Sequence, residues 1–428
     1  MLHEIPIEQL GARGDAMAKA VQACVHCGFC LPTCPTYRVL GQETDSPRGR
    51  IMLMKEVLEG KIPAEDAQLH IDRCLGCLAC ETSCPSGVKY GELLSPYRAK
   101  RRSEGAAGGN RLRRWLTAIT LPYPWRFRLA MRLGQLSSRL RFLTPAVLHP
   151  MLDLVPDTLP ASQTSVEFTA AQGEVRARVA LLLGCAQQVL APRINAAVIR
   201  ALSLNGCEIH IPKNQTCCGA LSWHIGDDQQ AARFARANLN AFSGNIDFIV
   251  TTAAGCGSGL HDYPLVLAGT VYADQAKTLA SKTLDVSAFL DKLGIVPPPP
   301  LKRSLKVAYH DACHLGHAQR VRSQPRRLLR SIPGVELIEI PDSEICCGSA
   351  GTYNMDQPEL SAQLGREKAE KIIATGADVV TMGNIGCEVQ IQRYLKEAGS
   401  RIKVMHTIEL LDAAYRNIDP INRGNKLD

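Results

Sequence analysis

The stretches CVHCGFCLPTCP (residues 24–35) and CLGCLACETSCP (residues 74–85) decide the fold of the first part of this chain. Each follows the spacing Cys-x2-Cys-x2-Cys-x3-Cys-Pro, which is typical of bacterial ferredoxins with two [4Fe–4S] clusters. In such proteins the fourth cysteine of each run binds the cluster of the other run. The spacing therefore predicts two crossed ligand sets, namely Cys24, Cys27, Cys30 and Cys84 for cluster 1, and Cys74, Cys77, Cys80 and Cys34 for cluster 2.

Two other uses of these cysteines fit the sequence less well. The N-terminal residues MLHEIPIEQLGARGD lack the basic-then-apolar pattern of a signal peptide, so we expect a cytoplasmic, reducing location in which disulfides are rare. Structural zinc sites use pairs of Cys-x-x-Cys and need no third cysteine at the next step and no fourth one before proline. The eight cysteines therefore indicate clusters that carry electrons.

Length and composition indicate a multidomain globular protein. A chain of 428 residues is expected to form two or three domains, and an apolar content of 46% is ordinary for such proteins. No stretch approaches the ~20 apolar residues needed to span a bilayer, so we expect no transmembrane helix. Seventeen cysteines are far more than a chain without disulfides needs, which predicts further cysteine chemistry beyond the first eight.

Residues 1–100 are predicted to form an α-helical ferredoxin domain, because RGRIMLMKEVLEG (48–60) has apolar residues at helical spacing. Residues 101–174 are predicted to be a basic linker with two amphipathic helices. The first carries an apolar stripe in RLRRWLTAIT (111–120), and a second stripe runs from Trp125 to Leu143. From Arg98 to Arg141 the segment holds twelve basic residues and one acid, a local net charge of +11 in a chain of net +8.

This basic segment predicts a peripheral contact with the inner face of the cell membrane, because anionic headgroups attract lysine and arginine and interfacial tryptophans suit the same boundary. A docking face for partner subunits, or a helical cover over the rest of the chain, is the alternative. We expect no nucleic-acid partner, because an iron–sulfur relay has no role beside one.

Residues 175–296 and 301–428 are predicted to be one α/β domain written twice, with Pro297–Pro300 as a stiff spacer. Strands alternate with helices, which predicts parallel βαβ units. The expected strands are 179–183, 208–211 and 248–251 in the first copy, and 305–309, 335–340 and 379–381 in the second. Cysteines follow the strand ends at offsets of 128 to 131 residues between the copies, at the sheet edge where ligands bind in such folds.

Each copy carries four cysteines, two of them adjacent and followed by glycine. They are Cys185, Cys217, Cys218 and Cys256 in the first copy, and Cys313, Cys346, Cys347 and Cys387 in the second. Two adjacent cysteines cannot both bind a single tetrahedral metal ion without strain. They could, however, reach two irons of an opened cluster, or one could bind while its neighbour stays free. Buried free thiols are the alternative. These eight are therefore candidates for one or two further clusters or redox sites.

The paired cysteines resemble the CCG-domain family, known from the catalytic subunit of heterodisulfide reductase. The family pattern closes with Cys-x-x-Cys, which implies five cysteines and a non-cubane [4Fe–4S] cluster. Here Gly259 and Gln390 stand where the fifth cysteine would be. This departure favours electron transfer or a quinone-related role over disulfide reduction. His310, Asp311 and His314 flank Cys313 and could tune or protonate a group bound there.

Over nearly its whole length the sequence resembles the family of glycolate oxidase iron–sulfur subunits. The stretches that carry the resemblance are CVHCGFCLPTCPTYRVLG, DSPRGRI, CETSCPSGVKY, GCAQ, TTAAGCG and CCGSAGTYN. It implies a quinone-linked glycolate dehydrogenase complex in which FAD-binding subunits oxidise glycolate, or another 2-hydroxy acid such as D-lactate. This chain would pass their electrons towards the quinone pool. We accordingly expect no catalytic residue and no flavin site here.

Two further functions stay open at this point. One is the corresponding subunit of anaerobic glycerol-3-phosphate dehydrogenase. The other is a thiol/disulfide enzyme similar to heterodisulfide reductase, against which Gly259 and Gln390 argue. An iron–sulfur redox sensor would need a DNA-binding element, and the sequence shows no helix-turn-helix pattern.

Overall fold

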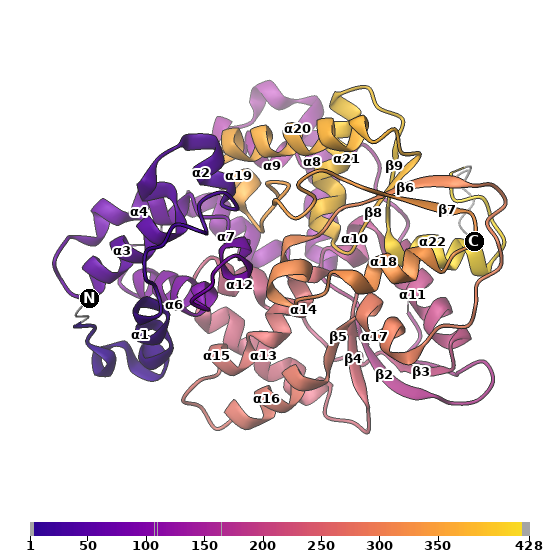
Figure 1. Cartoon of the computed structure of the whole chain (residues 1–428), viewed down its shortest axis with the longest axis horizontal. Coiled ribbons are helices and arrows are strands. Elements are labelled where there is room, and N and C mark those ends of the chain that lie inside the picture. The colour runs from indigo at the N-terminus through magenta and orange to yellow at the C-terminus, as the bar shows by residue number, and fades with distance from the viewer. Residues whose placement is uncertain (1–3, 107, 109, 164, 422–428) are drawn as a thin grey trace.

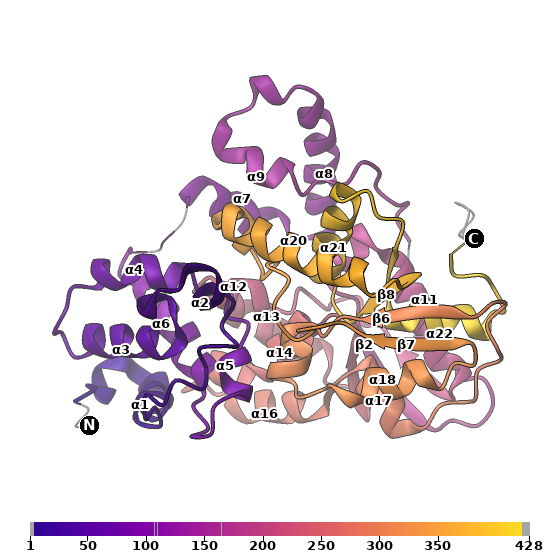
Figure 2. The ribbon, with the colours of Figure 1, turned by 45° about the horizontal axis from the view of Figure 1, so that its top comes forward.

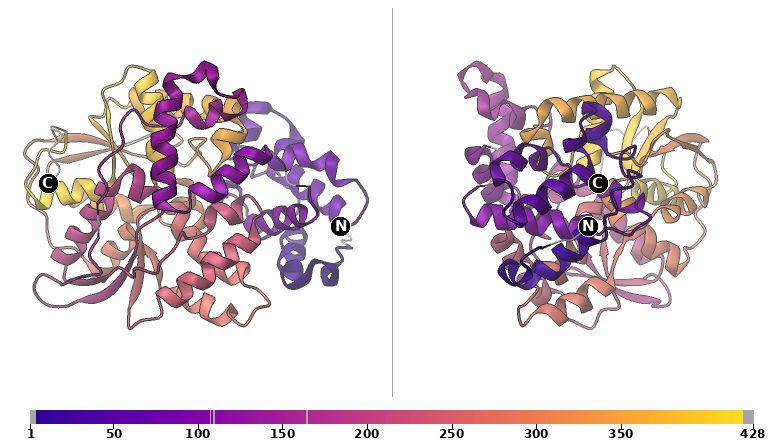
Figure 3. Two further views of the ribbon diagram at one scale, coloured as in Figure 1. Left: turned by 180° about the vertical axis from the view of Figure 1, so that it is seen from behind. Right: turned by 60° about the vertical axis from the view of Figure 1, so that its left-hand side comes forward.

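The computed structural model describes residues 4–106, 108, 110–163 and 165–421. A helical N-terminal head lies at one end of the molecule, and two α/β domains fill the rest (Figure 1). The helices of residues 111–152 cross the face that is hidden in Figure 1 and visible in Figure 3. The predicted fold class, a helical ferredoxin-like part followed by two α/β domains with parallel strands, is confirmed.

The head consists of helices joined by the cysteine-bearing loops. Its helices are η1 (Ile7–Arg13), α1 (Gly14–Gln22), α2 (Pro35–Leu40), η2 (Glu43–Asp45), α3 (Pro47–Leu58), α4 (Ala64–Asp72), α5 (Ala79–Thr82) and α6 (Tyr90–Ser103). The helix expected over 48–60 is α3. Ser46 caps it by accepting a hydrogen bond of 3.1 Å from the N–H of Gly49. Pro35 and Pro47 occupy first helical positions, where a missing N–H costs nothing.

Two separate sheets form the α/β part. The first contains β1 (Phe168–Thr169), β2 (Ala177–Leu182), β3 (Cys207–His210), β4 (Phe248–Thr251) and β5 (Thr283–Asp285), in the order β1-β3-β2-β4-β5. The second contains β6 (Leu305–Tyr309), β7 (Val335–Glu339), β8 (Val379–Met382) and β9 (Lys403–His406), in the order β7-β6-β8-β9. All these pairings are parallel except that of β1 with β3.

All six expected strands are present to within two residues at either end, but β1, β5 and β9 were not anticipated from the sequence. These three are two to four residues long and lie at the sheet edges. They are too short to show a clear period of two, and their pairing depends on a neighbouring strand that the local sequence does not reveal.

Helices cover both faces of each sheet. The first domain has α10 (Gln187–Leu190), α11 (Pro192–Leu204), α12 (Ala220–His224), α13 (Asp228–Ala241), α14 (Ala254–His261), α15 (Tyr263–Val266), α16 (Ala273–Lys282) and α17 (Val286–Leu293). The second has the π-helical turn η5 (His314–Ala318), α18 (Ser323–Arg330), α19 (Tyr353–Asp356), α20 (Pro358–Ala374), α21 (Ile385–Glu397) and α22 (Thr407–Tyr415).

The two domains share one hydrophobic core. Helices α11, α17, α18 and α22 pack on one another between the sheets, and buried side chains of β2, β3, β6 and β8 close the core from either side. Beside this core Arg200 on α11 makes a bidentate ion pair with Asp412 on α22, with N–O distances of 2.9 and 2.6 Å. The Asp412 carboxylate is 1% exposed and the Arg200 side chain is 43% exposed, so the pair ties the two copies together at the edge of the interface.

Replacing Asp412 by alanine is expected to lower the stability of the α/β part by about 2 kcal/mol, because it removes the buried carboxylate of a charge-assisted pair. The exposed Arg178–Glu208 pair on the surface of the first sheet is the matched control. Arg178→Ala should cost less than about 1 kcal/mol. Urea unfolding followed by circular dichroism measures both changes. Equal effects of the two substitutions would contradict the shared core.

The linker contains α7 (Arg111–Thr120), α8 (Pro124–Arg139), η3 (Arg141–Leu143), η4 (Ala146–Leu148) and α9 (His149–Leu152). Helix α7 spans the predicted RLRRWLTAIT segment. Helix α8 ends at Arg139, so the stripe expected to reach Leu143 leaves the helix before Leu140. The hairpin of α8 and α9 projects from the body of the molecule (Figure 2). In the described residues no helix is long and apolar enough to cross a bilayer.

Candidate functional site

The cysteines of the head line two pockets. One is lined by Cys24, Cys27, Cys30 and Cys84 together with Cys80, and the other by Cys34, Cys74, Cys77 and Cys80. The fourth cysteine of each run therefore lies with the first three of the other run, as the crossed scheme requires. Metal ligation by these sulfurs stays a prediction, but four convergent thiols around each hollow fit a [4Fe–4S] cluster.

The two pockets differ in their exposure. Cys27 is exposed, and its neighbours Val25 and Phe29 are 66% and 67% exposed, so the first pocket lies at the surface of the head. Cys34, Cys74 and Cys77 are buried. The first pocket is thus open to a partner from outside, whereas the second faces the interior of the chain.

A buried arginine lies beside the second pocket. Arg50, 1% exposed, donates to Thr36 Oγ1 at 3.0 Å and to Asp45 Oδ1 at 3.2 Å, and its Nη1 lies 3.9 Å from the Cys34 sulfur. Burial alone would raise the pKa of the Cys74 thiol, but the positive charges of Arg50 and Arg98 lower it below its usual value. These cations therefore favour the thiolate form, which is the form that binds metal.

In each α/β domain the four predicted cysteines meet at the carboxyl edge of the sheet. They follow β2, β3 and β4 in the first domain and β6, β7 and β8 in the second. The sulfurs of Cys185 and Cys217 are 3.5 Å apart, and those of Cys313 and Cys346 are 4.0 Å apart. We call these groups of four cysteines site 1 and site 2.

Contacts between the sulfurs of each site shift the pKa values of the thiols in different directions. Hydrogen bonds from Cys217 and Cys256 hold the pKa of the Cys218 thiol well below its usual value, and burial opposes this effect. Cys347 behaves in the same way in site 2, with Cys346 and Cys387 as donors. Each site therefore favours at least one thiolate at its centre, as a metal site with sulfur ligands requires.

The glycine after each cysteine pair has a positive φ, +78° at Gly219 and +86° at Gly348. A Cβ atom on Gly348 would lie 2.7 Å from the carbonyl oxygen of Ser361. Glycine thus lets the loop turn sharply while it packs against the following helix, and this turn presents both adjacent cysteines to the site.

Neither position of the missing fifth cysteine supplies a sulfur ligand. A Cβ atom on Gly259 would lie 2.6 Å from the Ala220 Cβ, so a larger side chain there would collide with the segment after the cysteine pair. Gln390 is buried, and its amide donates to the Cys347 carbonyl at 3.3 Å and to Ser361 Oγ at 3.0 Å. Gln390 therefore stabilises the loop of site 2 through these two hydrogen bonds.

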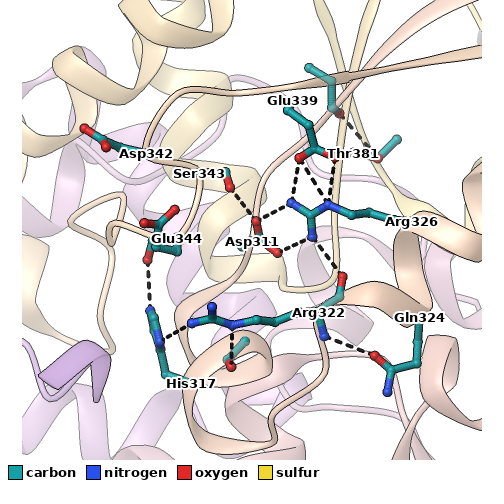
Figure 4. A network of polar contacts seen from close by, with 12 residues as sticks. Asp311, His317, Arg322, Gln324, Arg326, Glu339, Asp342, Ser343, Glu344 and Thr381 are labelled. Carbon is teal, nitrogen blue, oxygen red and sulfur yellow. Dashed lines mark hydrogen bonds and ion pairs between the residues drawn. The ribbon is translucent and has the colours of Figure 1, made fainter. Parts of the chain in front are cut away.

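Two of the residues that flank Cys313 have structural partners. Asp311 accepts two hydrogen bonds from Arg326, of 2.8 and 2.7 Å, and one from Ser343 (Figure 4). His314 contacts Ser258 Oγ through Nδ1 at 2.6 Å and the Gly76 carbonyl through Nε2 at 3.0 Å. Both residues hold the loop of site 2 in place. The third flanking residue, His310, has a different environment, described below.

Site 2 packs directly against the buried pocket of the head. Cys77 of the head forms one hydrophobic cluster with Cys313, Cys346 and Tyr353. Beside it, the ring of His224 from the first domain lies against that of His314 from the second, with centroids 5.2 Å apart. Both rings meet the backbone of Gly76, between the first two cysteines of the second run. We call this junction of the three parts the seam.

Sequence reasoning missed Arg50, His224 and the seam itself. Arg50 lies within the stretch DSPRGRI, but nothing in its spacing links it to the cysteines, and His224 lies more than a hundred positions from the second cysteine run that it meets. The second cysteine run of the head lies near Cys313 because the α/β domains pack against the head. No local sequence pattern predicts this packing.

Comparisons with known proteins match this architecture. Residues 179–261 and 307–392 each match the family described as a cysteine-rich domain, and residues 20–88 match the 4Fe-4S dicluster domain. The glycolate oxidase iron–sulfur subunit of Escherichia coli is 36% identical, over 94% of this chain and 96% of its own length. The probable glycolate oxidase iron–sulfur subunit of Bacillus subtilis is 35% identical, over 91% and 92%.

The chain belongs to the family of glycolate oxidase iron–sulfur subunits. More distant relatives share the architecture: one subunit of the fumarate reductase (CoM/CoB) of Methanothermobacter marburgensis is 27% identical over 93% of this chain and 73% of its own length. A solved structure of a hypothetical protein from Helicobacter pylori has a similar fold, with a TM-score of 0.50 at 8% identity over 95% of this chain and 72% of that one.

The arrangement of the pockets leads to a test by substitution of one cysteine. Cys34→Ser is expected to remove the cluster held by the second run and to leave that of its own run, because Cys34 lines the pocket of Cys74 and Cys77. Cys84→Ser is the mirror control. Iron analysis and EPR of the reduced, anaerobically prepared chain would distinguish the two losses. If Cys34→Ser abolished the signal that Cys24→Ser also abolishes, the crossed scheme would be wrong.

Proposed function

We propose that this chain is the electron-transfer subunit of a flavin-dependent glycolate dehydrogenase complex and passes electrons towards quinone. Clusters held by the head, and further iron–sulfur centres held by sites 1 and 2, would accept and release single electrons. The residues of this chain would fix the order and the environment of these centres. Oxidation of the 2-hydroxy acid would take place on partner subunits that bind FAD.

The observation that carries this proposal is the line of cysteine sites through the molecule. It begins at the exposed pocket around Cys27, continues to the buried pocket around Cys77, and reaches site 2 across the seam. Such an order suits a relay with an open entrance and a buried interior. This order of sites does not require a substrate pocket in this chain.

The family membership favours glycolate over glycerol 3-phosphate as the substrate of the partner subunits. The thiol/disulfide alternative is less well supported, because Gly259 has no room for a fifth sulfur and Gln390 is already hydrogen-bonded. Relatives named lactate utilization protein A match 55% of the chain, so D-lactate is a second substrate to test.

The complex tests this function directly. The tagged full-length chain, purified from its own cells, should bring down flavin-containing partners that reduce a quinone analogue with glycolate. Cys77→Ser should abolish quinone reduction and leave glycolate-dependent reduction of a dye at the flavin intact. Activity with glycerol 3-phosphate but not glycolate, or the absence of flavin partners, would contradict the proposal.

We also propose that α8 brings this complex to the membrane. An apolar stripe on α8 and η3 is open to solvent, and its members are Trp125 (67% exposed), Leu129 (51%), Leu133 (56%), Leu136 (59%) and Phe142 (82%). The arginines of the segment contribute less than their number suggests. Arg98 donates to the Cys74 carbonyl, Arg102 pairs with Asp227 and Arg128 donates to the Pro160 carbonyl, so these three hold the linker in place.

Substituting Leu129, Leu133 and Leu136 by serine together is expected to weaken binding to liposomes by about 3 kcal/mol, roughly a hundred-fold, since each leucine would otherwise bury its exposed half in lipid. Flotation with vesicles of varied anionic content measures it. Val271→Ser, at a 91% exposed site on the first α/β domain, is the control and should change nothing. Unchanged flotation of the triple variant, together with loss of the flavin partners, would assign the stripe to subunit docking.

A further inference from the structure

We propose that His310 is a nitrogen ligand of the metal centre at site 2, so that the two cysteine-rich domains hold chemically different centres. This inference rests on the proposed function, which places a centre in site 2. Site 1 offers four sulfurs, whereas site 2 offers four sulfurs and one imidazole.

His310 follows β6 directly and is 0% exposed. One of its ring nitrogens and the sulfurs of Cys347 and Cys387 lie within 4.8 Å of one another, a spacing that a bound metal could bridge. Neither nitrogen makes a hydrogen bond of acceptable geometry, although the ring lies close enough to Cys347 to stabilise its thiolate. The imidazole thus points one nitrogen at the sulfurs of site 2.

A buried imidazole without a partner is costly, since each unsatisfied buried polar group costs about 1–3 kcal/mol. The neighbouring histidines avoid this cost. His314 contacts Ser258 and Gly76, and His317 lies 2.7 Å from Thr82 Oγ1 and 3.1 Å from the Glu344 carbonyl (Figure 4). His310 differs from both in having no structural partner of this kind, and a metal on one nitrogen would remove part of the cost.

The internal repeat provides the comparison. His310 lies three residues before Cys313, and the residue three before Cys185 in the first domain is Leu182, 2% exposed. The same position thus holds an apolar side chain beside site 1 and a potential ligand beside site 2. The amide nitrogen of Gln390 is committed to the Cys347 and Ser361 carbonyls. Its amide oxygen is of the ligand type that suits Mg²⁺, Ca²⁺ and Mn²⁺, whereas imidazole suits iron, so His310 is the better replacement for the missing fifth sulfur.

The consequence concerns reduction potential. Histidine in place of cysteine raises the potential of an iron–sulfur centre, because a neutral ligand replaces an anionic one. Site 2 would then attract electrons more strongly than a centre ligated by cysteine alone. Its contact with Cys77 across the seam places this stronger acceptor next to the head.

The test compares the full-length chain with two variants. His310→Leu copies the residue that the first domain uses, and His310→Cys replaces the nitrogen by sulfur. Pulsed EPR of the reduced, 15N-histidine-labelled wild type should show a nitrogen coupling that both variants lack. Both variants should keep iron in site 2, because its four cysteines remain, as they do beside Leu182 in site 1, but both should lower the reduction potential of the centre, since the neutral nitrogen ligand is lost. His210→Gln, on β3 with its ring against Phe168, is the matched control and should retain both iron and coupling.

Three results would overturn the assignment: no histidine coupling in a wild-type chain with more than eight irons, the same coupling in His310→Leu, or an unchanged reduction potential of the site 2 centre in a folded His310→Leu. Circular dichroism of the variants checks folding. A wild-type chain with about eight irons and no other metal would instead show that site 2 is empty. The proposed centres of the α/β domains would then fail together with this inference, while the head would stand.

Discussion

The packing of Cys77 of the head in one buried cluster with Cys313 and Cys346 of the second α/β domain is the constraint on which the rest of the structure depends. Because buried thiols that bind metal must be held without strain, the loops on both sides of this contact are fixed from several directions. Arg98 holds the Cys74 carbonyl from the head, and His314 holds Gly76 from the α/β part. The seam thereby joins the head and the two α/β domains into one packed unit.

The internal repeat has two consequences. The shared core of α11, α17, α18 and α22 fixes the two sheets relative to each other, and Cys77 of the head shares a buried cluster with two cysteines of site 2. The two copies differ at the position three residues before the first cysteine of each site, with Leu182 in one and His310 in the other. The two domains share a fold because their strands place the backbone in the same way. Their sites differ in chemistry because single side chains determine what each site can bind.

The sequence predicted the cysteine sets, the repeat and the six central strands, because each depends on local spacing: the Cys-Pro runs, the 128–131 offset and the apolar strand cores. It did not predict the edge strands β1, β5 and β9, the end of α8 at Arg139, or the Arg50–Asp45 pair under the second pocket. These features depend on which distant segments meet. The apolar stripe of α8 was recognised, but its exposure to solvent follows from packing.

Magnetic coupling across the seam tests the central claim most directly. In the reduced full-length chain we expect the EPR signal of the cluster held by Cys74, Cys77 and Cys80 to be broadened by a second spin at site 2. The broadening should vanish in Cys346→Ser and persist in Cys217→Ser, since Cys77 shares its buried cluster with cysteines of site 2, whereas site 1 meets the head at Ala99 of α6. A spectrum that is the same in wild type and Cys346→Ser, or that changes only in Cys217→Ser, would contradict the relay described here.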